Sequence, residues 1–435
     1  MELTKRIEAH TARVGVIGQG YVGLPLSLLF SEAGFPVTAF DNDAAKVEAL
    51  NDGRSYIAHV GSSRVAATKD RAVDFHATTD ISELSECDAI LICLPTPLGK
   101  HREPDLSYVL GAARDIAQHL HAGSLVVLES TTYPGTTDEE VQPILESTGL
   151  STPDDFFLAF SPEREDPGNR QFQTASIPKV VGGVNPESTR VASALYAEVM
   201  DAVVPVSNSR VAEASKLLEN IYRAVNIALV NELKMTFDRM DIDVWQVIDA
   251  AKTKPFGFQA FYPGPGLGGH CIPLDPFYLS WKAAEHGVWT RFIELAGEIN
   301  TGMPTWVVAK VAAALSDEGK GLRGAKVLVL GLSYKADIDD DRESPSYELI
   351  RLLRERGADV SYCDPHFPVA RPGRRSNPEM RSVPLSSEEF ARHDLVLLST
   401  AHSEFRDPAL YRGTTIVVDT RNVVDDAWSP RVVRA

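Results

Sequence analysis

The sequence predicts an α/β protein in which two Rossmann-like, doubly wound domains are joined by a long central helix. A short apolar strand, Val14–Ile17, runs directly into a glycine-rich turn at residues 18–23. Apolar strands and helical patterns then alternate, and a second such series begins near Gly321. Between them, residues 209–239 contain neither glycine nor proline and repeat apolar residues at helical spacing. Such alternation is typical of open parallel sheets covered by helices.

The composition bounds the class of protein. With 435 residues the chain exceeds one ordinary hydrophobic core, so we expect two or three domains. A formal net charge of -17 argues against a nucleic-acid surface and against binding to anionic membranes. Without an apolar signal segment or a membrane-length apolar run, we expect a cytoplasmic protein. The 4 widely spaced cysteines indicate neither a disulfide framework nor a metal site.

The first glycine turn has the context of a dinucleotide-binding unit. The pattern at 18–23 follows a strand and opens a helix predicted over 24–33. The next strand, 37–40, ends in Asp41, 23 positions after Gly18. Amides at the helix start would hold a pyrophosphate, while Asp41 would bond the adenosine ribose and repel a 2′-phosphate. We therefore predict NAD rather than NADP, the alternative being a doubly wound unit that binds nothing.

Polar side chains follow the later strands of the first series. Strands are predicted at 89–94, 124–128 and 157–160, with a helix over 106–119. Ligands of open α/β sheets bind outside the carboxyl ends of the strands, which makes Thr96, Ser130 and Thr131 candidates for contacts to a nicotinamide ribose or a substrate. Hydroxyls at such places cap helices about as often. Glu163 follows strand 157–160 as a candidate acid or base, or as part of a solvated turn.

The long helix predicted over 209–239 carries two polar side chains one turn apart. Lys216 and Asn220 are four residues apart and share a face. They could donate to a developing oxyanion, or they could belong to an ordinary polar face. A helix of this length would span roughly 45 Å at 1.5 Å per residue, enough to join two domains and to offer a dimerisation face.

The stretch from Phe256 to Pro276 holds 5 glycines and 4 prolines, which predicts a shaped loop rather than a helix or a central strand. Cys271 lies in this stretch after His270, with Asp275 four residues later. A thiol in such a loop can act as a nucleophile. The alternative is a tight turn with an incidental cysteine.

The last series predicts a second Rossmann-like domain. Strands are expected at 326–331 and 360–363, with a helix over 344–356 between them. The stretches Gly34–Asp41 and Gly357–Asp364 share their length and their terminal residues. The first turn lacks the glycine pattern, so no second dinucleotide is expected. The cationic residues near its strand ends, which suit a nucleotide diphosphate or are surface charges, are Lys335, Arg342 and Arg421.

Seven motifs, in order, resemble those of the nucleotide-sugar 6-dehydrogenases, the family of UDP-glucose and UDP-N-acetylhexosamine dehydrogenases. They are GQGYVGLP at 18–25, LPTP at 94–97, ESTTYPGTT at 129–137, SPER at 161–164, EASKLLEN at 213–220, GPGLGGHCIPLDP at 264–276 and GLSYKADIDDDRESPS at 331–346. The resemblance implies an NAD-binding domain at 1–205, a central helical dimerisation region with the catalytic cysteine loop at 206–315 and a UDP-sugar-binding domain at 316–435. It also implies a homodimer or a higher homo-oligomer.

The resemblance further implies a four-electron oxidation of the sugar C6 alcohol. Cys271 would capture the aldehyde as a thiohemiacetal, whose oxidation gives a thioester that water hydrolyses. The implied catalytic residues are Cys271, Lys216, Asn220, Glu163, Asp275 and Thr131. The implied cofactor contacts are Gly18, Gly20, Tyr21, Val22, Gly23, Asp41, Lys46, Thr96, Thr131 and Arg342. The implied substrate contacts are Glu163, Arg164, Lys216, Asn220, Phe261, Tyr262, Gly268, His270, Lys335 and Arg421.

Departures from the UDP-glucose enzymes point to an acetamido sugar. His270 replaces a small residue, Leu274 replaces a lysine, and SPEREDPGN at 161–169 with KTKPFGF at 252–258 is similar to UDP-GlcNAc 6-dehydrogenases of surface-polysaccharide synthesis. Aromatic residues at 256, 258, 261 and 262 could enclose an N-acetyl methyl group, or they could only pack the loop at a dimer interface. UDP-ManNAc and UDP-glucose stay open as substrates, as do a two-electron hydroxyacid-type dehydrogenase and a catalytically silent nucleotide-sugar-binding protein.

Overall fold

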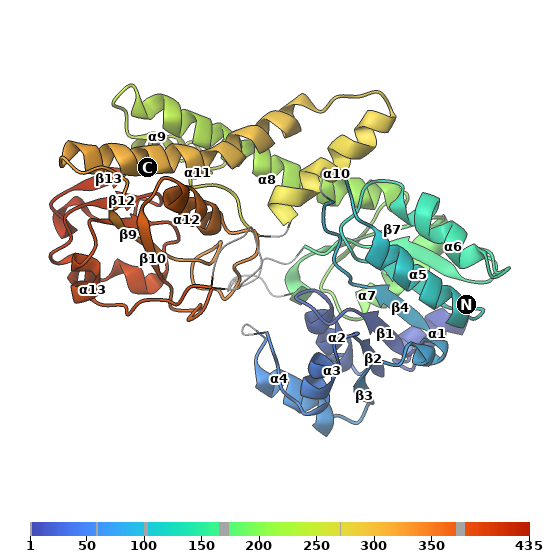
Figure 1. Cartoon of the computed structure of the whole chain (residues 1–435). Coiled ribbons are helices and arrows are strands. Elements are labelled where there is room, and N and C mark those ends of the chain that lie inside the picture. Colours follow the sequence, from blue (N-terminus) through green and yellow to red (C-terminus); the bar gives the residue numbers. More distant parts are fainter. Residues whose placement is uncertain (1, 58–59, 100–102, 165–173, 270, 371–378) are drawn as a thin grey trace. The chain divides into compact units, whose positions relative to one another are not determined.

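The computed structural model describes residues 2–57, 60–99, 103–164, 174–269, 271–370 and 379–435, and of Cys271 it describes the backbone alone. The chain divides into two compact units (Figure 1). The first unit comprises Met1–Glu219 and Phe277–Val288, and the second comprises Asn220–Pro276 and Trp289–Ala435. Each unit contains one sheet, and helix α8 (Ser209–Asp238) carries the chain from the first unit to the second. The predicted fold class, with two Rossmann-like domains and a long central helix, is confirmed.

The first unit is built on a sheet of eight strands in the order β3-β2-β1-β4-β5-β6-β7-β8. The strands are β1 (Val14–Ile17), β2 (Val37–Phe40), β3 (Phe75–Thr78), β4 (Ala89–Ile92), β5 (Leu125–Leu128), β6 (Phe157–Phe160), β7 (Lys179–Gly183) and β8 (Val203–Pro205). All neighbouring strands pair in parallel except β6 and β7, which are antiparallel. The carboxyl ends of the parallel strands therefore share one edge of the sheet, and the amino end of β7 joins them there.

Helices cover both faces of this sheet. They are α1 (Glu2–Glu8), α2 (Gly23–Glu32), α3 (Ala44–Asn51), α4 (Ser62–Ala66), α5 (Ser107–His119), α6 (Gln142–Glu146) and α7 (Pro186–Ala197). Side chains alternate along β4, so that Ala89 and Leu91 join a cluster with α1, α2 and α7, while Ile90 and Ile92 join another with α5 and α6. Because both faces are buried at the centre of the sheet, the central strands β1, β4, β5 and β6 are apolar throughout, as the sequence predicts for parallel strands.

The second unit contains a parallel five-stranded sheet in the order β10-β9-β11-β12-β13. Its strands are β9 (Lys326–Leu330), β10 (Asp359–Cys363), β11 (Leu395–Leu398), β12 (Val417–Asp419) and β13 (Val432–Arg434), and its helices besides α8 are α9 (Val244–Ala251), α10 (Cys271–Glu285, up to Pro276 in this unit), α11 (Arg291–Asp317), α12 (Pro345–Glu355) and α13 (Ser387–Ala391). Short single-turn helices link the strands of both units.

The similarity between the two sheets extends to their first turns. Gly18 follows β1 with φ +91° and Gly331 follows β9 with φ +89°, a left-handed conformation that favours glycine. The amide of Gln19 donates to Asp41 at 2.9 Å, and the amide of Leu332 donates to Asp364 at 2.5 Å. The glycine-to-aspartate frame in the sequence therefore reports a shared strand–turn–helix–strand geometry.

The prediction of a loop throughout residues 256–276 is wrong for its last part. Helix α10 begins at Cys271 and includes Pro273 and Pro276. Pro273 is tolerated in the first helical turn because the first four amides have no partner within the helix, and its fixed φ suits the helix. Pro276 lies inside the helix, where the missing amide removes one backbone hydrogen bond. The run from Phe277 to Glu285 then continues the helix.

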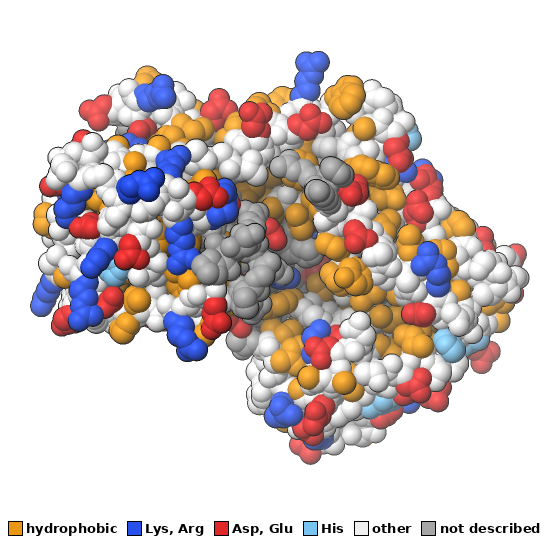
Figure 2. Space-filling view, in the orientation of Figure 1, with side chains coloured by type: hydrophobic (Ala, Val, Ile, Leu, Met, Phe, Trp, Pro, Cys, Tyr) orange, Lys and Arg blue, Asp and Glu red, His pale blue; other side chains and the backbone are white. Residues whose placement is uncertain are grey.

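Acidic and basic side chains are interspersed on the face shown in Figure 2. Among the described helices, none combines the length and the apolar character needed to cross a membrane.

Candidate active site

The turn between β1 and α2 leaves room for a ligand at one glycine. A Cβ atom on Gly18 would lie 2.6 Å from the Cys93 carbonyl oxygen, and one on Gly23 would collide with the Gly18 carbonyl. A Cβ on Gly20 would meet no heavy atom within 4 Å. Tyr21 and Val22 are half-buried and precede the first helical residue of α2. The packed glycines thus shape the turn, and the open one lies where a pyrophosphate would approach the helix amides, so these residues fit NAD.

Asp41 lies beside Lys46, which the family resemblance implies as a cofactor contact but not as a partner of Asp41. Its carboxylate accepts from the amides of Gln19 and Asp43 at 2.9 and 3.0 Å. The ammonium of Lys46 pairs with it at 3.1 Å. Because the Lys46 charge offsets that of Asp41, Asp41 repels a 2′-phosphate less strongly than an unpaired carboxylate would. Preference for NAD then depends more on the ribose hydrogen bond than on charge.

The hydroxyls predicted at the ends of β4 and β5 hold these two loops together. Thr96 donates to the carbonyl of Thr131 at 2.7 Å. Ser130 accepts from the amide of Leu94 at 3.0 Å and donates to the carbonyl of Ile92 at 3.2 Å. These bonds favour the structural interpretation of Thr96 and Ser130, whereas the half-buried Thr131 contributes its carbonyl and not its hydroxyl to them.

The loop after β6 is attached to α8 by two cations. The buried Lys216 donates from its ammonium to the backbone carbonyl of Glu163. Arg164 pairs with Glu219 at 2.8 Å and donates to the Pro178 carbonyl at 2.6 Å. The predicted residues Glu163, Arg164 and Lys216 are thus brought together within the first unit.

Glu213 on α8 attaches the loop after β5 to that helix. The sequence reasoning did not identify Glu213 as a site residue. Its buried carboxylate accepts from the amides of Gly135 and Thr137 at 2.7 and 2.9 Å and from the Thr137 hydroxyl at 2.7 Å. Burial raises the pKa of Glu213 to about 7, against the effect of these bonds, which favour the charged form. The available signal was its place as the first residue of the motif at 213–220.

Asn220 and Asp275 meet in the second unit. The side-chain amide of Asn220 on α8 donates to the carboxylate of Asp275 on α10 at 2.6 Å, and both residues are buried. Lys216 precedes Asn220 by one turn of α8. Cys271 is the first residue of α10, one turn before Asp275, while His270 lies outside the described residues.

The glycine loop before α10 lies against the loops that follow β9 and β12. The amide of Gly264 donates to Asn231 at 3.0 Å, and a Cβ there would lie 2.6 Å from a terminal nitrogen of Arg421. A Cβ on Gly268 would collide with Tyr334, and the amide of Gly269 donates to the Arg342 carbonyl at 2.9 Å. At Gly268 and Gly269 only glycine permits this approach without a shift of Tyr334, which gives the glycine content of the stretch a physical reason.

The three predicted cations of the second unit differ in their surroundings. The guanidinium of Arg342 is paired with Asp340, the shortest distance being 2.7 Å. Arg421 donates through Nε to the Ser399 carbonyl at 2.8 Å, and burial lowers its pKa to about 10, so that it remains a cation at neutral pH. Lys335 is half-buried after β9. Arg421 is the cation best suited to an added anion, because the Ser399 carbonyl engages its Nε and, among the described residues, no carboxylate pairs with its guanidinium.

Comparison with known proteins decides the family. The NAD-binding domain of the UDP-glucose/GDP-mannose dehydrogenase family matches residues 12–200, its central domain matches 210–302 and its UDP-binding domain matches 328–426. The chain belongs to the UDP-glucose/GDP-mannose dehydrogenase family. It is an NAD-dependent nucleotide-sugar dehydrogenase, and the family resemblance and the cofactor predicted from the sequence are confirmed.

Relatives of this dehydrogenase differ in the sugar that their names give. It is 36% identical to UDP-N-acetyl-D-glucosamine 6-dehydrogenase of Pseudomonas aeruginosa, over 91% of this chain and 92% of that protein. It is 37% identical to UDP-N-acetyl-D-mannosamine dehydrogenase of Yersinia pestis, over 79% of this chain and 82% of that protein. The solved UDP-ManNAc dehydrogenase of Pyrococcus horikoshii has a TM-score of 0.86 at 30% identity, covering 95% of this chain and 96% of that one.

Two of the four aromatic residues before the glycine loop pack on helices of the second unit. Phe261 meets Tyr222 of α8 edge-on at 5.7 Å, and Tyr262 stacks on Trp245 of α9 at 5.7 Å. Phe256 and Phe258 are exposed. This arrangement favours the packing interpretation of the aromatics over an acetyl-enclosing one.

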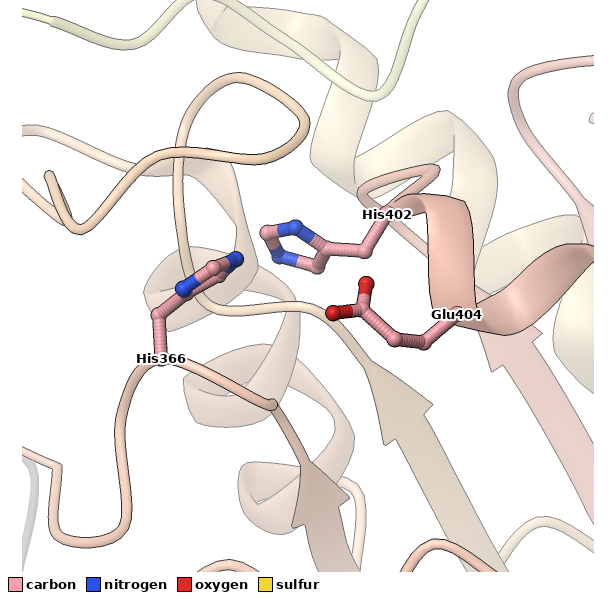
Figure 3. A group of neighbouring side chains, drawn as sticks. All are labelled: His366, His402 and Glu404. Atoms are coloured by element: carbon pink, nitrogen blue, oxygen red, sulfur yellow. The ribbon is translucent and has the colours of Figure 1, made fainter.

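One group of side chains in this dehydrogenase resembles a metal site. His366, His402 and Glu404 have potential ligand atoms within 4.8 Å of one another (Figure 3). However, His402 Nδ1 accepts from the amide of Asp337 at 2.9 Å, and its Nε2 lies 3.2 Å from Asp364. An acceptor Nδ1 requires the proton on Nε2, so neither ring nitrogen offers a lone pair. As arranged, this group does not hold a metal ion.

Proposed function

We propose that the protein oxidises the C6 alcohol of UDP-GlcNAc to the carboxylate, forming UDP-N-acetylglucosaminuronate for surface-polysaccharide synthesis. The observation that carries the proposal is the buried bond between Asn220 and Asp275, at the start of the helix that Cys271 opens. The identity of 36% to a relative named for UDP-GlcNAc supports this sugar, as do the stretches at 161–169 and 252–258.

Bound NAD would accept a hydride from C6 in each of two successive oxidations. In the proposed mechanism the Cys271 thiolate adds to the aldehyde carbon, and the thiohemiacetal loses two electrons to become a thioester. A helix start favours negative charge, as a thiolate requires, and Cys271 opens α10. Lys216 and Asn220 donate to the oxygen on C6 as its charge develops.

Hydrolysis of the thioester completes the reaction. Water adds to the carbonyl carbon, the C–S bond breaks, and the thiolate leaves with the carboxylate as product. Glu163 and Asp275 are the proposed acceptors of the water's proton. Thr131 orders this region. Thr96 and Thr131 would lie by the nicotinamide, with Asp41 and Lys46 at the adenosine ribose.

We propose that the nucleotide is held by residues 316–435, with NAD held by residues 1–205 and residues 206–315 forming the dimerisation region. Arg421 and Lys335 are the proposed contacts to the diphosphate. Arg342 supports the glycine loop through its carbonyl, because its guanidinium is engaged by Asp340. As an enzyme that consumes NAD and a nucleotide sugar, it would work in the cytoplasm.

A homodimer is proposed from the exposed face of α8. Its exposed large hydrophobic residues are Val211, Leu218, Tyr222 and Leu229, which follow one another by 7, 4 and 7 residues. This spacing places them along one side of the helix. Leu218, at 66% exposure, is the most exposed of them.

The test is NADH formation over UDP-GlcNAc, UDP-GalNAc, UDP-ManNAc and UDP-glucose. We expect two NADH per UDP-GlcNAc, and a kcat/KM at least about tenfold above that for UDP-glucose, the cost of one hydrogen bond to the acetamido group that UDP-glucose cannot make. A preference for UDP-ManNAc would overturn the proposed stereochemistry at C2 of the sugar. One NADH per sugar would indicate a two-electron dehydrogenase. No NADH would indicate a catalytically silent nucleotide-sugar-binding protein. Cys271→Ala should fold but form no uronate, and wild-type turnover in it would refute the thioester.

A further inference from the structure

We propose that Lys179 is a positioning residue that fixes the backbone around Glu163. The inference rests on the proposed function in one respect, because it takes Glu163 as a carboxylate of the hydrolytic step. Lys179 is the first residue of β7 and belongs to the first unit, as do all residues that it contacts.

The ammonium of Lys179 is enclosed by three groups. Lys179 and Glu129 have side-chain exposures of 6% and 0%, and they pair at 2.5 Å. The other oxygen of Glu129 accepts from the Tyr196 hydroxyl, and the Tyr196 ring centroid lies 5.1 Å from the ammonium. Lys179 also donates to the carbonyl of Pro162 at 3.3 Å.

The topology of the sheet explains how Lys179 reaches this place. Because β7 runs antiparallel to β6, its first residue lies at the edge where β5 and β6 end. Glu129 directly follows β5, and Pro162 comes two residues after β6. Lys179 therefore joins the loop that carries Thr131 to the loop that carries Glu163.

Two lysines thus anchor the peptide groups on both sides of Glu163. The carbonyl of Pro162, which precedes Glu163, accepts from Lys179, and the carbonyl of Glu163 itself accepts from Lys216. Fixing both peptide planes restricts φ and ψ of Glu163, and with them the direction of its side chain.

A buried ion pair is a poor device for stability alone. Replacing such a pair by uncharged residues of similar size is often neutral or stabilising, whereas removing one partner is costly. Stability and positioning can therefore be separated. Lys179→Met with Glu129→Gln removes both charges and the bond to Pro162. Glu129→Gln alone removes one charge and keeps that bond.

We expect Lys179→Met/Glu129→Gln to melt near the wild-type temperature yet to lose kcat by about a hundredfold, the size of a general acid–base contribution, with KM changed less than about threefold. Glu129→Gln should keep kcat within a few-fold. Arg6→Met, which breaks a pair with the buried Asp88 just before β4, at the opposite edge of the sheet, should lower only the melting temperature. Wild-type kcat in the double variant would overturn the proposal.

Coupling to Glu163 provides the second measurement. If Lys179 acts through Glu163, the double variant should cause little further loss of kcat in a Glu163→Gln background, whereas general damage to the fold would be additive. Additive losses would overturn the proposal. If the double variant does not fold, the kcat of Glu129→Gln decides. This variant keeps the hydrogen bond from Lys179 to Pro162, so a hundredfold loss of kcat in it would contradict the proposed role of that bond. Absence of a Cys271 adduct in Glu163→Gln would count instead against the proposed function.

Discussion

Asp41 has partners within the protein that limit what it offers to a ribose. Its two oxygens have about four lone pairs. Two amides and the ammonium of Lys46 occupy three of these, with two bonds to one oxygen and one to the other. The less occupied oxygen therefore remains for a ribose hydroxyl. Without Asp41, the same Lys46 would face the ribose as a cation.

Asp41→Ala should shift the cofactor preference toward NADP. We expect the ratio of kcat/KM for NADP to that for NAD to rise at least about tenfold, because Lys46 becomes available to a 2′-phosphate. Steady-state kinetics with both cofactors measure the ratio. Adding Lys46→Ala should cancel the gain, and Asp41→Asn, which keeps an acceptor for the amides, should retain more stability. Equal kcat/KM for both cofactors in the wild type would refute the preference.

The residues foreseen from the sequence are those with a local signal. Spacing on one helix placed Lys216 and Asn220 together, and a glycine-rich stretch indicated the neighbourhood of Asp275. Glu213 and Lys179 were missed because their partners lie 76 and 50 residues away in the sequence. A buried lysine at the start of a strand has no periodicity that separates it from an exposed one. The antiparallel direction of β7, on which the position of Lys179 depends, likewise leaves no mark in composition.

Helices and strands with a continuous local pattern were also easier to predict than those that depend on distant contacts. The seven strands that the sequence predicted, and α8, begin and end within two residues of their predicted bounds, because each is an uninterrupted apolar or helical pattern. Strands β3, β7, β8, β11, β12 and β13 were not predicted. The start of α10 was missed, because two prolines outweighed the downstream helical pattern. The short helical segment η3 (Thr136–Val141) depends on Glu213, whose carboxylate accepts a hydrogen bond from the amide of Thr137 at the start of the segment. That dependence makes the element sensitive to pH.

The free energy of unfolding should depend on pH through the carboxyl group of Glu213. Its pKa of about 7 lies above the ordinary 4.5, so the folded state holds this proton more tightly than the unfolded state. The associated stabilisation is complete below pH 4.5 and is lost as the pH rises through 7, by roughly 3 kcal/mol in all. Glu213→Gln should therefore show a smaller fall in melting temperature between pH 5 and pH 8 than the wild type.

The exposed Glu232 on the same helix provides the matched control. Glu232→Gln should leave the pH dependence of the melting temperature unchanged. The difference between the wild type and each variant isolates one carboxyl group from all others that titrate in this range. Equal slopes for the wild type and Glu213→Gln would contradict a raised pKa.

The whole chain repeats one plan and uses it twice in different ways. The order β10-β9-β11-β12 corresponds to β2-β1-β4-β5. In the first unit the carboxylate after the second strand is paired with Lys46. In the second unit the equivalent Asp364 is bonded by the buried His402, which comes from the loop after β11. The His402 side chain thus occupies the place beside Asp364. This agrees with the absence of the GxGxxG pattern from the turn after β9, for which no second dinucleotide is expected.

Assembly is the property of the whole molecule that a single substitution tests most directly. Leu218→Glu places a charge in the middle of the exposed α8 stripe. A buried unpaired charge costs about 3–5 kcal/mol, so the dissociation constant of the proposed dimer should rise at least about a hundredfold. Sedimentation over a concentration series measures it. Leu385→Glu, at an exposed leucine away from α8, should leave the dissociation constant unchanged. A monomeric wild type at micromolar concentration, or an unchanged dimer in Leu218→Glu, would remove α8 as the contact.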